Sequence, residues 1–363
     1  MNITVVGAGV VGSAIAYELA SRGADVTVLD ARGPSLGATR ASAGILAPHL
    51  EGHIPALLQL ASCSLSMYDD FIRRVERDSG RRVEYERHGT LQVALSDREA
   101  RQLSADALTL KQQGVDHVLL DPAGTQRVEP KLTDRATAGL LVPSHGYVCA
   151  TSLTHALVAA AEARGACVTT DTAIRIEGGQ TSAVVTTKTH VVQADAVIVA
   201  SGCWPIESRP SPAPPIRPIR GQLVQLHLDE PVASRVIWGR DCYLVPWRDG
   251  SVLVGATSED VGFDERSTAD GIRGLLNAAA DLLPALGHAR FQEVRVGLRP
   301  KGFDDLPIIG RSTTMPSVHY ALGHYRNGVL LAPITAALVA DLVIDGRERA
   351  ELALVRPDRR AEG

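Results

Sequence analysis

The chain has 363 residues, of which 45% are hydrophobic and 21% are charged, so it is long enough for two globular domains. Its 37 basic residues are balanced by 41 acidic residues, and this balance argues against a protein that binds nucleic-acid backbones. The five cysteines form no CxxC pair and no cluster with metal-ligand spacing, so we expect no metal site and a reducing compartment.

Two apolar stretches of the sequence are candidates for a signal peptide or a membrane span, either of which would decide the cellular location of the protein. The N-terminus opens directly into MNITVVGAGVVG, without the basic region and cleavage site of a signal peptide. The longest late apolar run, 329–344, contains Pro333 and Asp341 and is too short to span a bilayer. We therefore expect a cytoplasmic protein without a membrane span.

The first thirty residues predict a βαβ unit that binds a dinucleotide. The pattern is a strand at 3–6, a glycine-rich turn, a helix to about residue 22 and a second strand at 26–29. The G-x-G-x-x-G glycines allow the tight turn, the approach of a pyrophosphate and close packing of helix on strand, and they are Gly7, Gly9 and Gly12. Asp30 ends the second strand, where a carboxylate can accept hydrogen bonds from an adenosine ribose.

The nucleotide domain continues far from this opening motif, in helix or strand segments predicted at 152–163, 166–169, 194–202, 306–309 and 318–322. The last strand leads to GHYRNG (323–328) and a final helix, which has Pro333 near its start and Gly346 past its end. An NAD domain is usually contiguous, so a domain that is interrupted twice favours FAD.

Segments of different character lie between these pieces. Alternating apolar residues at 85–95 and 222–256 predict antiparallel strands, and 98–113 and 268–283 predict helices. The six prolines of 205–218 include two P-x-x-P spacings. A stiff crossover between domains is the favoured interpretation of this segment, and a ligand for an SH3-like domain is the alternative.

The predicted fold class is therefore α/β, with a Rossmann-like FAD-binding domain and an inserted substrate domain built on a mixed antiparallel sheet. We assign 1–84, 144–217 and 298–363 to the FAD-binding domain. The substrate-binding domain takes 85–143 and 218–297.

Eight segments together resemble one family. They are VVGAGVVGSAIAYELA (5–20), ASAGILAP (41–48), ADAVIVASGCW (194–204), RGQ (220–222), CYLVP (242–246), VGAT (254–257), GLRP (297–300) and GHYRNGVLLAP (323–333). On these residues the chain resembles the D-amino-acid oxidase family of FAD-dependent enzymes, and most closely its thiamine-pathway glycine oxidases. The last two segments are specific in combination.

The resemblance implies an FAD stretched across the nucleotide domain. Some relatives attach the flavin through a cysteine after G-L-R-P, but 301–310 contains no cysteine here, so non-covalent FAD is implied. Besides the glycine motif, the residues implied to line FAD are Asp30, Ala31, Thr39, Ala43, Gly44, Ile45, Ile174, Gly202, His324, Tyr325, Arg326, Asn327, Gly328, Val329 and Leu330. The backbone of 324–330 would lie against the isoalloxazine ring, which Gly323 and Gly328 allow to approach. The helix after Gly328 would present its N-terminal amides to the negative charge of the reduced flavin.

The resemblance also implies three substrate-site residues. Arg299 of G-L-R-P would bind the amino-acid carboxylate through two parallel hydrogen bonds, with a solvated surface arginine as the alternative. Tyr243 would add a second carboxylate contact, with a core tyrosine as the alternative. Arg326 would lie near the substrate amine and the flavin, and a loop-stabilising role is equally open. Asp241 and Ser258 stand where the glycine oxidase pattern has His and Met, so the substrate is less defined than the reaction type.

The implied reaction is the oxidation of glycine, sarcosine or a small D-amino acid. A hydride would pass from Cα of the neutral amine to flavin N5, water would hydrolyse the imine to an oxo acid and ammonia, and O2 would reoxidise the flavin to give hydrogen peroxide. Capture of the imine by a thiazole synthase would place the enzyme in thiamine synthesis. Family members often self-associate, so a homo-oligomer is plausible.

Three alternatives stay open. The first is a dehydrogenase of the same family that passes electrons to a quinone or a protein carrier. The second is a flavin-binding subunit of a larger complex, and the third is a nicotinamide dehydrogenase.

Overall fold

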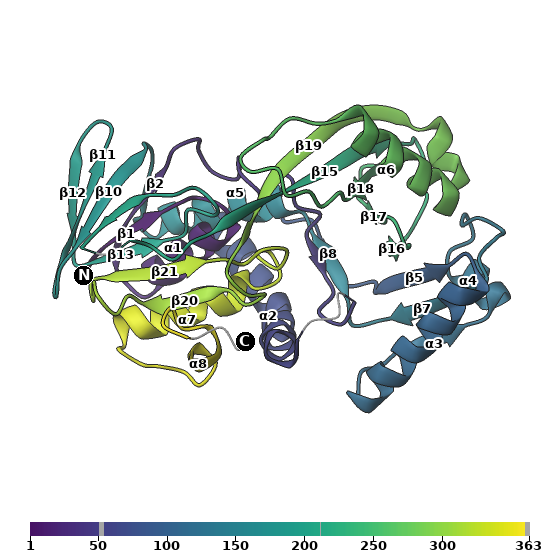
Figure 1. Cartoon of the computed structure of the whole chain (residues 1–363), viewed down its shortest axis with the longest axis horizontal. Coiled ribbons are helices and arrows are strands. Elements are labelled where there is room, and N and C mark those ends of the chain that lie inside the picture. The colour runs from purple at the N-terminus through teal and green to yellow at the C-terminus, as the bar shows by residue number, and fades with distance from the viewer. Residues whose placement is uncertain (51–53, 211, 360–363) are drawn as a thin grey trace.

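The computed structural model describes residues 1–50, 54–210 and 212–359. It consists of two adjoining parts, each built on a large β-sheet, and the long strands β15 (Arg217–His227) and β19 (Arg290–Lys301) extend from one part into the other (Figure 1). No helix in these three ranges combines the length and the apolar character that are needed to cross a membrane.

The first part is organised around a six-stranded sheet in the order β20-β21-β13-β1-β2-β9. Its strands are β1 (Asn2–Val6), β2 (Asp25–Asp30), β9 (Cys167–Thr170), β13 (Ala196–Val199), β20 (Ile308–Arg311) and β21 (Val318–Leu322). Neighbouring strands pair in parallel, except that β20 is antiparallel to β21. Parallel strands are covered on both faces, which explains why β1 and β13 are almost entirely buried instead of alternating.

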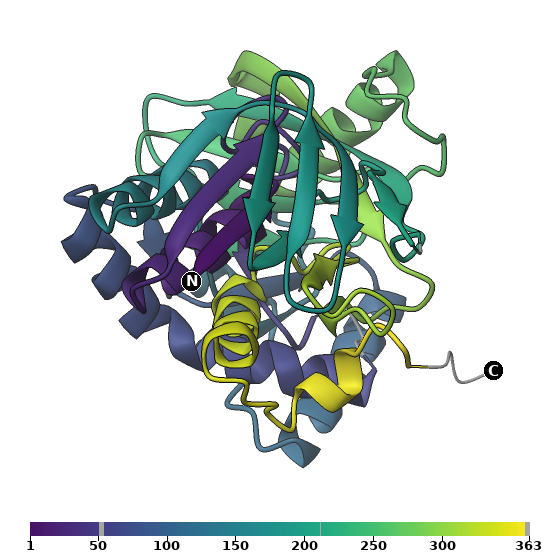
Figure 2. The same cartoon turned by 90° about the vertical axis from the view of Figure 1, so that its left-hand side faces the viewer.

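Helices cover one face of this sheet and a second sheet covers the other. The helices are α1 (Val10–Ser21), α2 (Pro55–Ser79), α5 (Ala150–Ala163) and α7 (Ala332–Ile344). The second sheet consists of β10 (Ala173–Gly178), β11 (Ala183–Thr187), β12 (Val191–Ala194) and β14 (Glu207–Arg209) (Figure 2). It packs on the six-stranded sheet through buried residues such as Ile176, Val185 and Val197.

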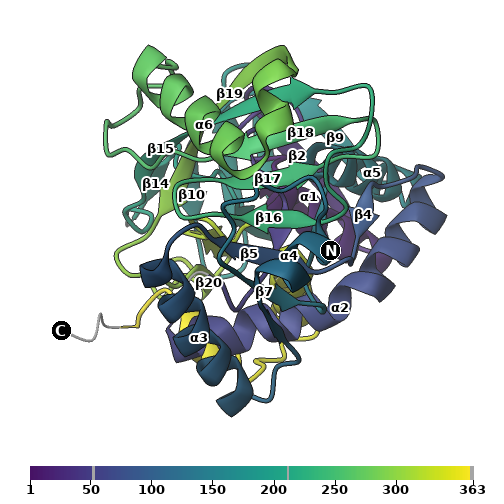
Figure 3. The same cartoon turned by 90° about the vertical axis from the view of Figure 1, so that its right-hand side faces the viewer.

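The second part is an eight-stranded sheet in the order β19-β15-β18-β17-β16-β5-β7-β6. Besides β15 and β19, its strands are β5 (Thr90–Ala94), β6 (Val118–Leu120), β7 (Ala138–Val142), β16 (Val236–Trp238), β17 (Tyr243–Pro246) and β18 (Ser251–Gly255). The pairing is antiparallel except between β16 and β5, so the sheet is mixed. Helices α3 (Asp97–Gln112), α4 (Pro122–Val128) and α6 (Ala269–Leu282) lie on its outer face (Figure 3).

Three short strands form a further small sheet, β3 (Ile45–Leu46), β8 (Gly146–Val148) and β4 (Tyr85–Glu86), in the order β3-β8-β4. The remaining short elements are the 3-10 helix η1 (Pro284–His288) and helix α8 (Leu352–Val355).

The structure confirms the predicted fold class and most of the predicted elements, and it adds several that the sequence pattern did not indicate. The largest are α2, β19 and the four-stranded sheet of β10, β11, β12 and β14. The strands of that sheet are short and partly exposed, so their apolar pattern is weak. The proline-rich segment 205–218 leads from β13 to β15 along the chain and contains β14. Residue 211 of this segment lies outside the described residues.

The final helix has the predicted limits, since α7 begins at Ala332 with Pro333 in its first turn and ends at Ile344, two residues before Gly346. Residues 328–331 form turns that separate Gly328 from the helix. The amide of Leu331 donates to the carbonyl of Asn327 at 2.8 Å, which closes a turn before the helix starts. The domain boundaries given above stay a prediction. The range assigned to the FAD-binding domain includes residues 51–53, 211 and 360–363, which lie outside the described residues.

Candidate active site

A large cavity of about 1010 Å³ lies where the two parts of the molecule meet. One wall comes from the segments that follow β1, β2, β9, β13 and β21, and the other comes from β17, β19 and the segment after β18. Ligands of open α/β sheets bind beyond the carboxyl ends of the parallel strands, and this cavity has that location. Its volume is at the upper end of the range for cofactor and substrate sites.

The turn after β1 can admit a phosphate group. Gly7 has a φ of +113°, and a Cβ at this position would collide with the carbonyl oxygen of Ala200. A Cβ at Gly12 would collide with the carbonyl oxygen of Gly7, so Gly12 lets α1 pack on β1. The N-cap residue Gly9 has no side chain and the first turn of α1 has no acidic residue. Oγ1 of Thr39 accepts from the amide of Val10 at 3.0 Å, and the positive end of the helix otherwise faces the cavity, where it can attract an anion.

Asp30 lies beside this turn at the end of β2. One carboxylate oxygen accepts a hydrogen bond from the amide of Ala8 at 2.7 Å, and the other accepts from the amides of Arg32 and Gly33 at 2.9 Å. These bonds fix the carboxylate at the cavity wall. Each carboxylate oxygen has two lone pairs, so acceptor capacity is left for ribose hydroxyls.

The turn at 328–331 presents backbone donors to the cavity. Across the described part of the chain, no acceptor is paired with the amides of Gly328, Val329 or Leu330, and all three residues line the cavity. Helix α2 holds this turn from behind, since Tyr68 donates to the carbonyl of Val329 at 2.5 Å and Ser64 donates to that of Leu330 at 2.7 Å. A row of amides that have no partner suits a group on which negative charge develops.

These features fit FAD. The glycine turn and the open end of α1 suit the pyrophosphate, Asp30 suits the ribose, and the amides of 328–330 suit the pyrimidine edge of the flavin. Cys203 also lines the cavity, where burial raises the pKa of its thiol to about 11 and keeps it protonated at neutral pH. Burial lowers the pKa of His324, another lining residue, to about 4, so its ring is neutral there as well.

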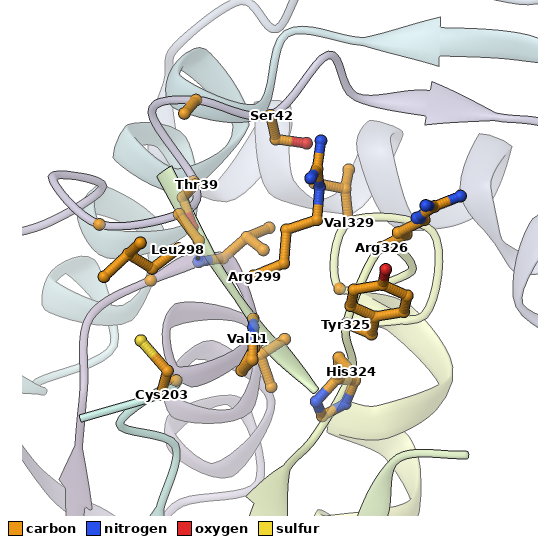
Figure 4. A pocket seen from close by; sticks show the side chains of 18 of the residues that line it. Val11, Thr39, Ser42, Cys203, Leu298, Arg299, His324, Tyr325, Arg326 and Val329 are labelled. Atoms are coloured by element: carbon orange, nitrogen blue, oxygen red, sulfur yellow. Dashed lines mark hydrogen bonds between the residues drawn. The ribbon is translucent and has the colours of Figure 1, made fainter. Parts of the chain in front are cut away.

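Arg299 projects from β19 beside the cavity (Figure 4). Two backbone carbonyls hold its guanidinium. Its Nη1 donates to the carbonyl of Thr257 at 3.0 Å and to that of Arg220 at 3.3 Å. A Cβ at Gly221 would collide with the guanidinium, so the absence of a side chain there makes room for it. The Nε and Nη2 donors have no partner among the described residues, and this edge of the fork can bind a carboxylate.

Tyr243 begins β17 and lines the same cavity. It pairs in register with Gly255 of β18, where a Cβ would come within 2.5 Å of the phenolic oxygen. The ring also lies 5.2 Å from that of Trp238, measured between centroids. The small residue on β18 and the indole together fix the phenol in place.

Arg326 lies in the loop after β21 (Figure 4). Its Nη2 is 3.5 Å from Oγ of Ser258, and its guanidinium lies over the ring of Tyr325 at 5.1 Å. Asp241 is three-quarters exposed, and its carboxylate is 3.9 Å from Nε of Arg240. This part of the cavity wall consists of Asp241, Ser258 and Arg326. It therefore carries one negative and one positive side chain.

A cluster that joins the two parts flanks the cavity beside Asp30. Arg32 lies over the ring of Trp204 at 4.8 Å, and its Nη1 is 3.1 Å from Glu265. Phe263 packs on Trp204 with ring centroids 5.2 Å apart. Arg32, Trp204 and Glu265 are lining residues that we did not predict, although Trp204 belongs to the ASGCW segment that carried the resemblance.

The structure brings almost all the predicted site residues to this cavity. Two of them are placed elsewhere: Gly12 is buried between α1 and β1, and Ile174 is not among the lining residues, whereas its neighbour Ala173 is. Thr257 and Leu298 were not singled out, but they lie in the VGAT and GLRP segments and line the cavity.

Comparison with known proteins agrees with this geometry. Residues 2–342 match the family model described as FAD dependent oxidoreductase. The bifunctional protein ThiO/ThiG of Nostoc sp. strain PCC 7120 is 37% identical over 95% of this chain, which covers 53% of that protein. The chain thus spans about half the length of this relative. The glycine oxidase of Geobacillus kaustophilus is 32% identical over 97% of this chain and 94% of its own.

The fold of the chain is also similar to that of solved structures of amine oxidases. The crystal structure of the G. kaustophilus glycine oxidase superposes with a TM-score of 0.92 at 29% identity and covers 99% of this chain and 98% of its own. The crystal structure of iminodiacetate oxidase from Chelativorans sp. BNC1 superposes with a TM-score of 0.88 at 27% identity, over 98% of both chains.

The chain belongs to the family of FAD-dependent oxidoreductases, and FAD is its cofactor. Within that family, its sequence and its fold are similar to those of glycine oxidases.

Proposed function

We propose that this enzyme oxidises small amino acids at the bond between Cα and nitrogen, with glycine as the first candidate substrate. The observation that carries this proposal is Arg299, whose Nη1 is saturated by two carbonyls while the rest of its fork faces no protein acceptor in the described part of the chain. A guanidinium prepared in this way at a flavin cavity suits a substrate with a carboxylate.

The cofactor, when bound non-covalently, supplies the acceptor for a hydride that leaves the substrate Cα. Arg299 orients the substrate by its carboxylate, and the hydroxyl of Tyr243 adds a second contact at that group. Orientation of Cα by these two side chains is the main catalytic contribution that the protein makes. The oxo acid and ammonia follow from hydrolysis of the imine, and O2 is the final acceptor, yielding hydrogen peroxide.

The substrate amine would react in its neutral form. Arg299 and Arg326 contribute positive charge to the wall of the cavity, and Asp241 contributes negative charge to the same wall. Nearby cations lower the pKa of an ammonium group, and the neutral amine has the lone pair that assists loss of hydride. No general base is required in this scheme.

The test is the visible spectrum of the purified protein without oxygen, before and after glycine is added. Bleaching of the flavin supports amino-acid oxidation, and return of the colour with hydrogen peroxide on admission of air supports O2 as the acceptor. A flavin that stays oxidised with glycine, sarcosine and small D-amino acids would contradict the proposal.

A second candidate is a dehydrogenase that passes electrons to a quinone or a protein carrier. The same experiment separates the two, because its flavin would bleach with substrate but reoxidise slowly in air.

A link to thiamine synthesis is supported by the relative from Nostoc, in which the similar region makes up about half of a ThiO/ThiG protein. Such a role would supply the imine to a thiazole synthase. It predicts that added synthase captures the imine from glycine in competition with hydrolysis.

A further inference from the structure

A partly buried polar network lies beside Arg299. It is centred on Glu259, whose carboxylate accepts hydrogen bonds from three side chains. Oε1 accepts from Oγ1 of Thr257 at 2.6 Å and from Nε2 of Gln222 at 2.8 Å, and Oε2 accepts from Nη2 of Arg220 at 2.5 Å. Gln222 is fully buried and Arg220 is 4% exposed, whereas the side chain of Glu259 is 27% exposed, so the network is buried on the side that faces the sheet.

The same residues provide the carbonyls that hold Arg299. Nη1 of Arg299 donates to the carbonyls of Thr257 and Arg220, the two residues that Glu259 binds through their side chains. The backbone of Glu259 also pairs with that of Arg220, with amide-to-carbonyl distances of 2.8 and 3.0 Å in the two directions. Glu259 is therefore linked to both supports of the guanidinium.

The segment that carries Thr257 and Glu259 has few other ties to the sheet. It follows β18 as irregular structure, and it is bonded to β15 through Arg220, Gln222 and an exposed ion pair between Asp260 and Arg217. The amide of Gln222 donates to Oγ1 of Thr257 at 2.9 Å, so this hydroxyl accepts one bond and donates one to Glu259. Loss of the carboxylate would remove the side-chain bond between Glu259 and Thr257, and Thr257 would then be held to the sheet by its two bonds to the backbone of Gln222.

We propose that Glu259 is a positioning residue for substrate binding, which fixes the Thr257 and Arg220 carbonyls and through them the direction in which Arg299 presents its free donors to a carboxylate. This inference rests on the proposed function. Burial acts to raise the pKa of Glu259, but the bonds from Arg220, Gln222 and Thr257 outweigh it and lower the pKa to about 2, so the residue is ionised across the working range.

The chain offers a matched control in Asp264. This residue pairs with the same arginine, at 3.1 Å from Nη1 of Arg220, but it has no bond to Thr257 or Gln222. Asp264→Asn therefore removes one negative partner of Arg220 and leaves the supports of Arg299 in place.

The experiment compares Glu259→Gln and Thr257→Val with Asp264→Asn, all as holoenzymes whose FAD content matches that of wild type. The Kd of acetate, a carboxylate without an amine, is measured from the change in the flavin spectrum, and KM and kcat are measured with glycine. We expect Glu259→Gln and Thr257→Val to raise the acetate Kd and the glycine KM by roughly tenfold with a smaller change in kcat, because a misdirected fork loses carboxylate affinity first. Asp264→Asn is expected to stay within about twofold of wild type.

A double variant tests whether the effect passes through Arg299. In an Arg299→Lys background, which has no fork to direct, Glu259→Gln is expected to change the acetate Kd by less than about twofold. A full tenfold effect in that background, or equal effects of Glu259→Gln and Asp264→Asn, would overturn the inference while leaving the proposed function intact. If Glu259→Gln does not fold, Thr257→Val decides by the same criteria. A wild-type enzyme that neither binds acetate nor oxidises glycine would overturn both proposals.

Discussion

Tyr68 on α2 donates its phenolic hydrogen to the carbonyl of Val329 at 2.5 Å, and so ties a helix of the first part to the turn whose amides line the candidate active site. Tyr68 is fully buried, and burial raises the pKa of its hydroxyl well above the usual value. The hydroxyl therefore stays protonated at neutral pH and keeps its role as donor.

Tyr68→Phe is expected to lower the free energy of unfolding by about 1–2 kcal/mol, because the Val329 carbonyl loses a buried donor. Relaxation of the turn should also weaken FAD binding by several-fold. Urea unfolding and fluorescence titration of the apoprotein with FAD measure the two effects. Tyr85→Phe is the control, since its hydroxyl bonds to Asp69 in an exposed position. Equal FAD affinity for the two variants would contradict a role for Tyr68 in the site.

Gly12→Ala is expected to abolish FAD binding, because the added Cβ collides with the carbonyl of Gly7 and pushes α1 away from β1. Gly274→Ala is the matched control within α6, where a Cβ meets no atom within 4 Å. There the change should stabilise the helix by about 0.5–1 kcal/mol and leave the flavin content unchanged. The ratio of the absorbance of flavin to that of protein after purification reports the outcome.

Arg299→Ala is expected to raise KM for glycine by roughly 100-fold, since charge-assisted hydrogen bonds to a carboxylate contribute up to about 3 kcal/mol. Arg326→Ala should cost less, because Arg326 is exposed and its contact with Ser258 is long at 3.5 Å. Steady-state kinetics with glycine on both variants measures which of the two substitutions raises KM more. A larger loss from Arg326→Ala would assign the carboxylate to that residue instead.

Asp241→Asn is expected to improve the use of acidic substrates without changing the use of glycine. The carboxylate of Asp241 lines the cavity and repels a second carboxylate on a substrate, whereas glycine has no side chain to meet it. Because Asp241 is 76% exposed, the gain in kcat/KM for D-aspartate should be only a few-fold and should shrink at high salt. No change in the ratio of D-aspartate to glycine would show that the side chain of Asp241 stays away from the substrate.

The protein is expected to lose stability as the pH falls from about 6.5 toward 4. Burial lowers the pKa of His319 to about 4, and neither of its ring nitrogens has a hydrogen-bond partner among the described residues. The unfolded chain takes up a proton near pH 6.5 and the folded chain does so only near pH 4, so the unfolded state binds more protons in this window and unfolding is favoured. His145 and His324 act in the same direction, with pKa values lowered to about 3 and about 4.

Urea unfolding at pH 7.5 and pH 5 measures this slope. His319→Leu should flatten it, because one protonation of the unfolded state contributes at most about 1.4 kcal/mol per pH unit. An exposed histidine, His88, provides the control, and His88→Leu should leave the slope unchanged. Identical slopes for the wild type and His319→Leu would contradict the assignment.

The nucleotide half of the site could be predicted from short stretches of sequence. Gly7, Gly12 and Asp30 lie within one βαβ unit, and each meets a local demand: a positive φ, a close helix–strand contact, or a carboxylate at the end of a strand. Each of these requirements limits which residue type can stand at its position, and the positions lie close together in the chain. The resulting motif can therefore be recognised in one sequence without a structure. The family resemblance then placed Arg299 and Tyr243, which the structure brings to the same cavity.

What the sequence could not show are contacts between distant segments. Tyr68 and Val329 are 261 residues apart, and Arg299 is separated from Thr257 by 42. Their meeting depends on the register of β15 with β19 and on how α2 packs behind the turn, and neither leaves a local signature. The sequence alone therefore determined the cofactor class and the residue types of the site. Only the tertiary structure decided which side chains hold those residues in place, because the orientation of a buried group is set by the partners that packing brings to it.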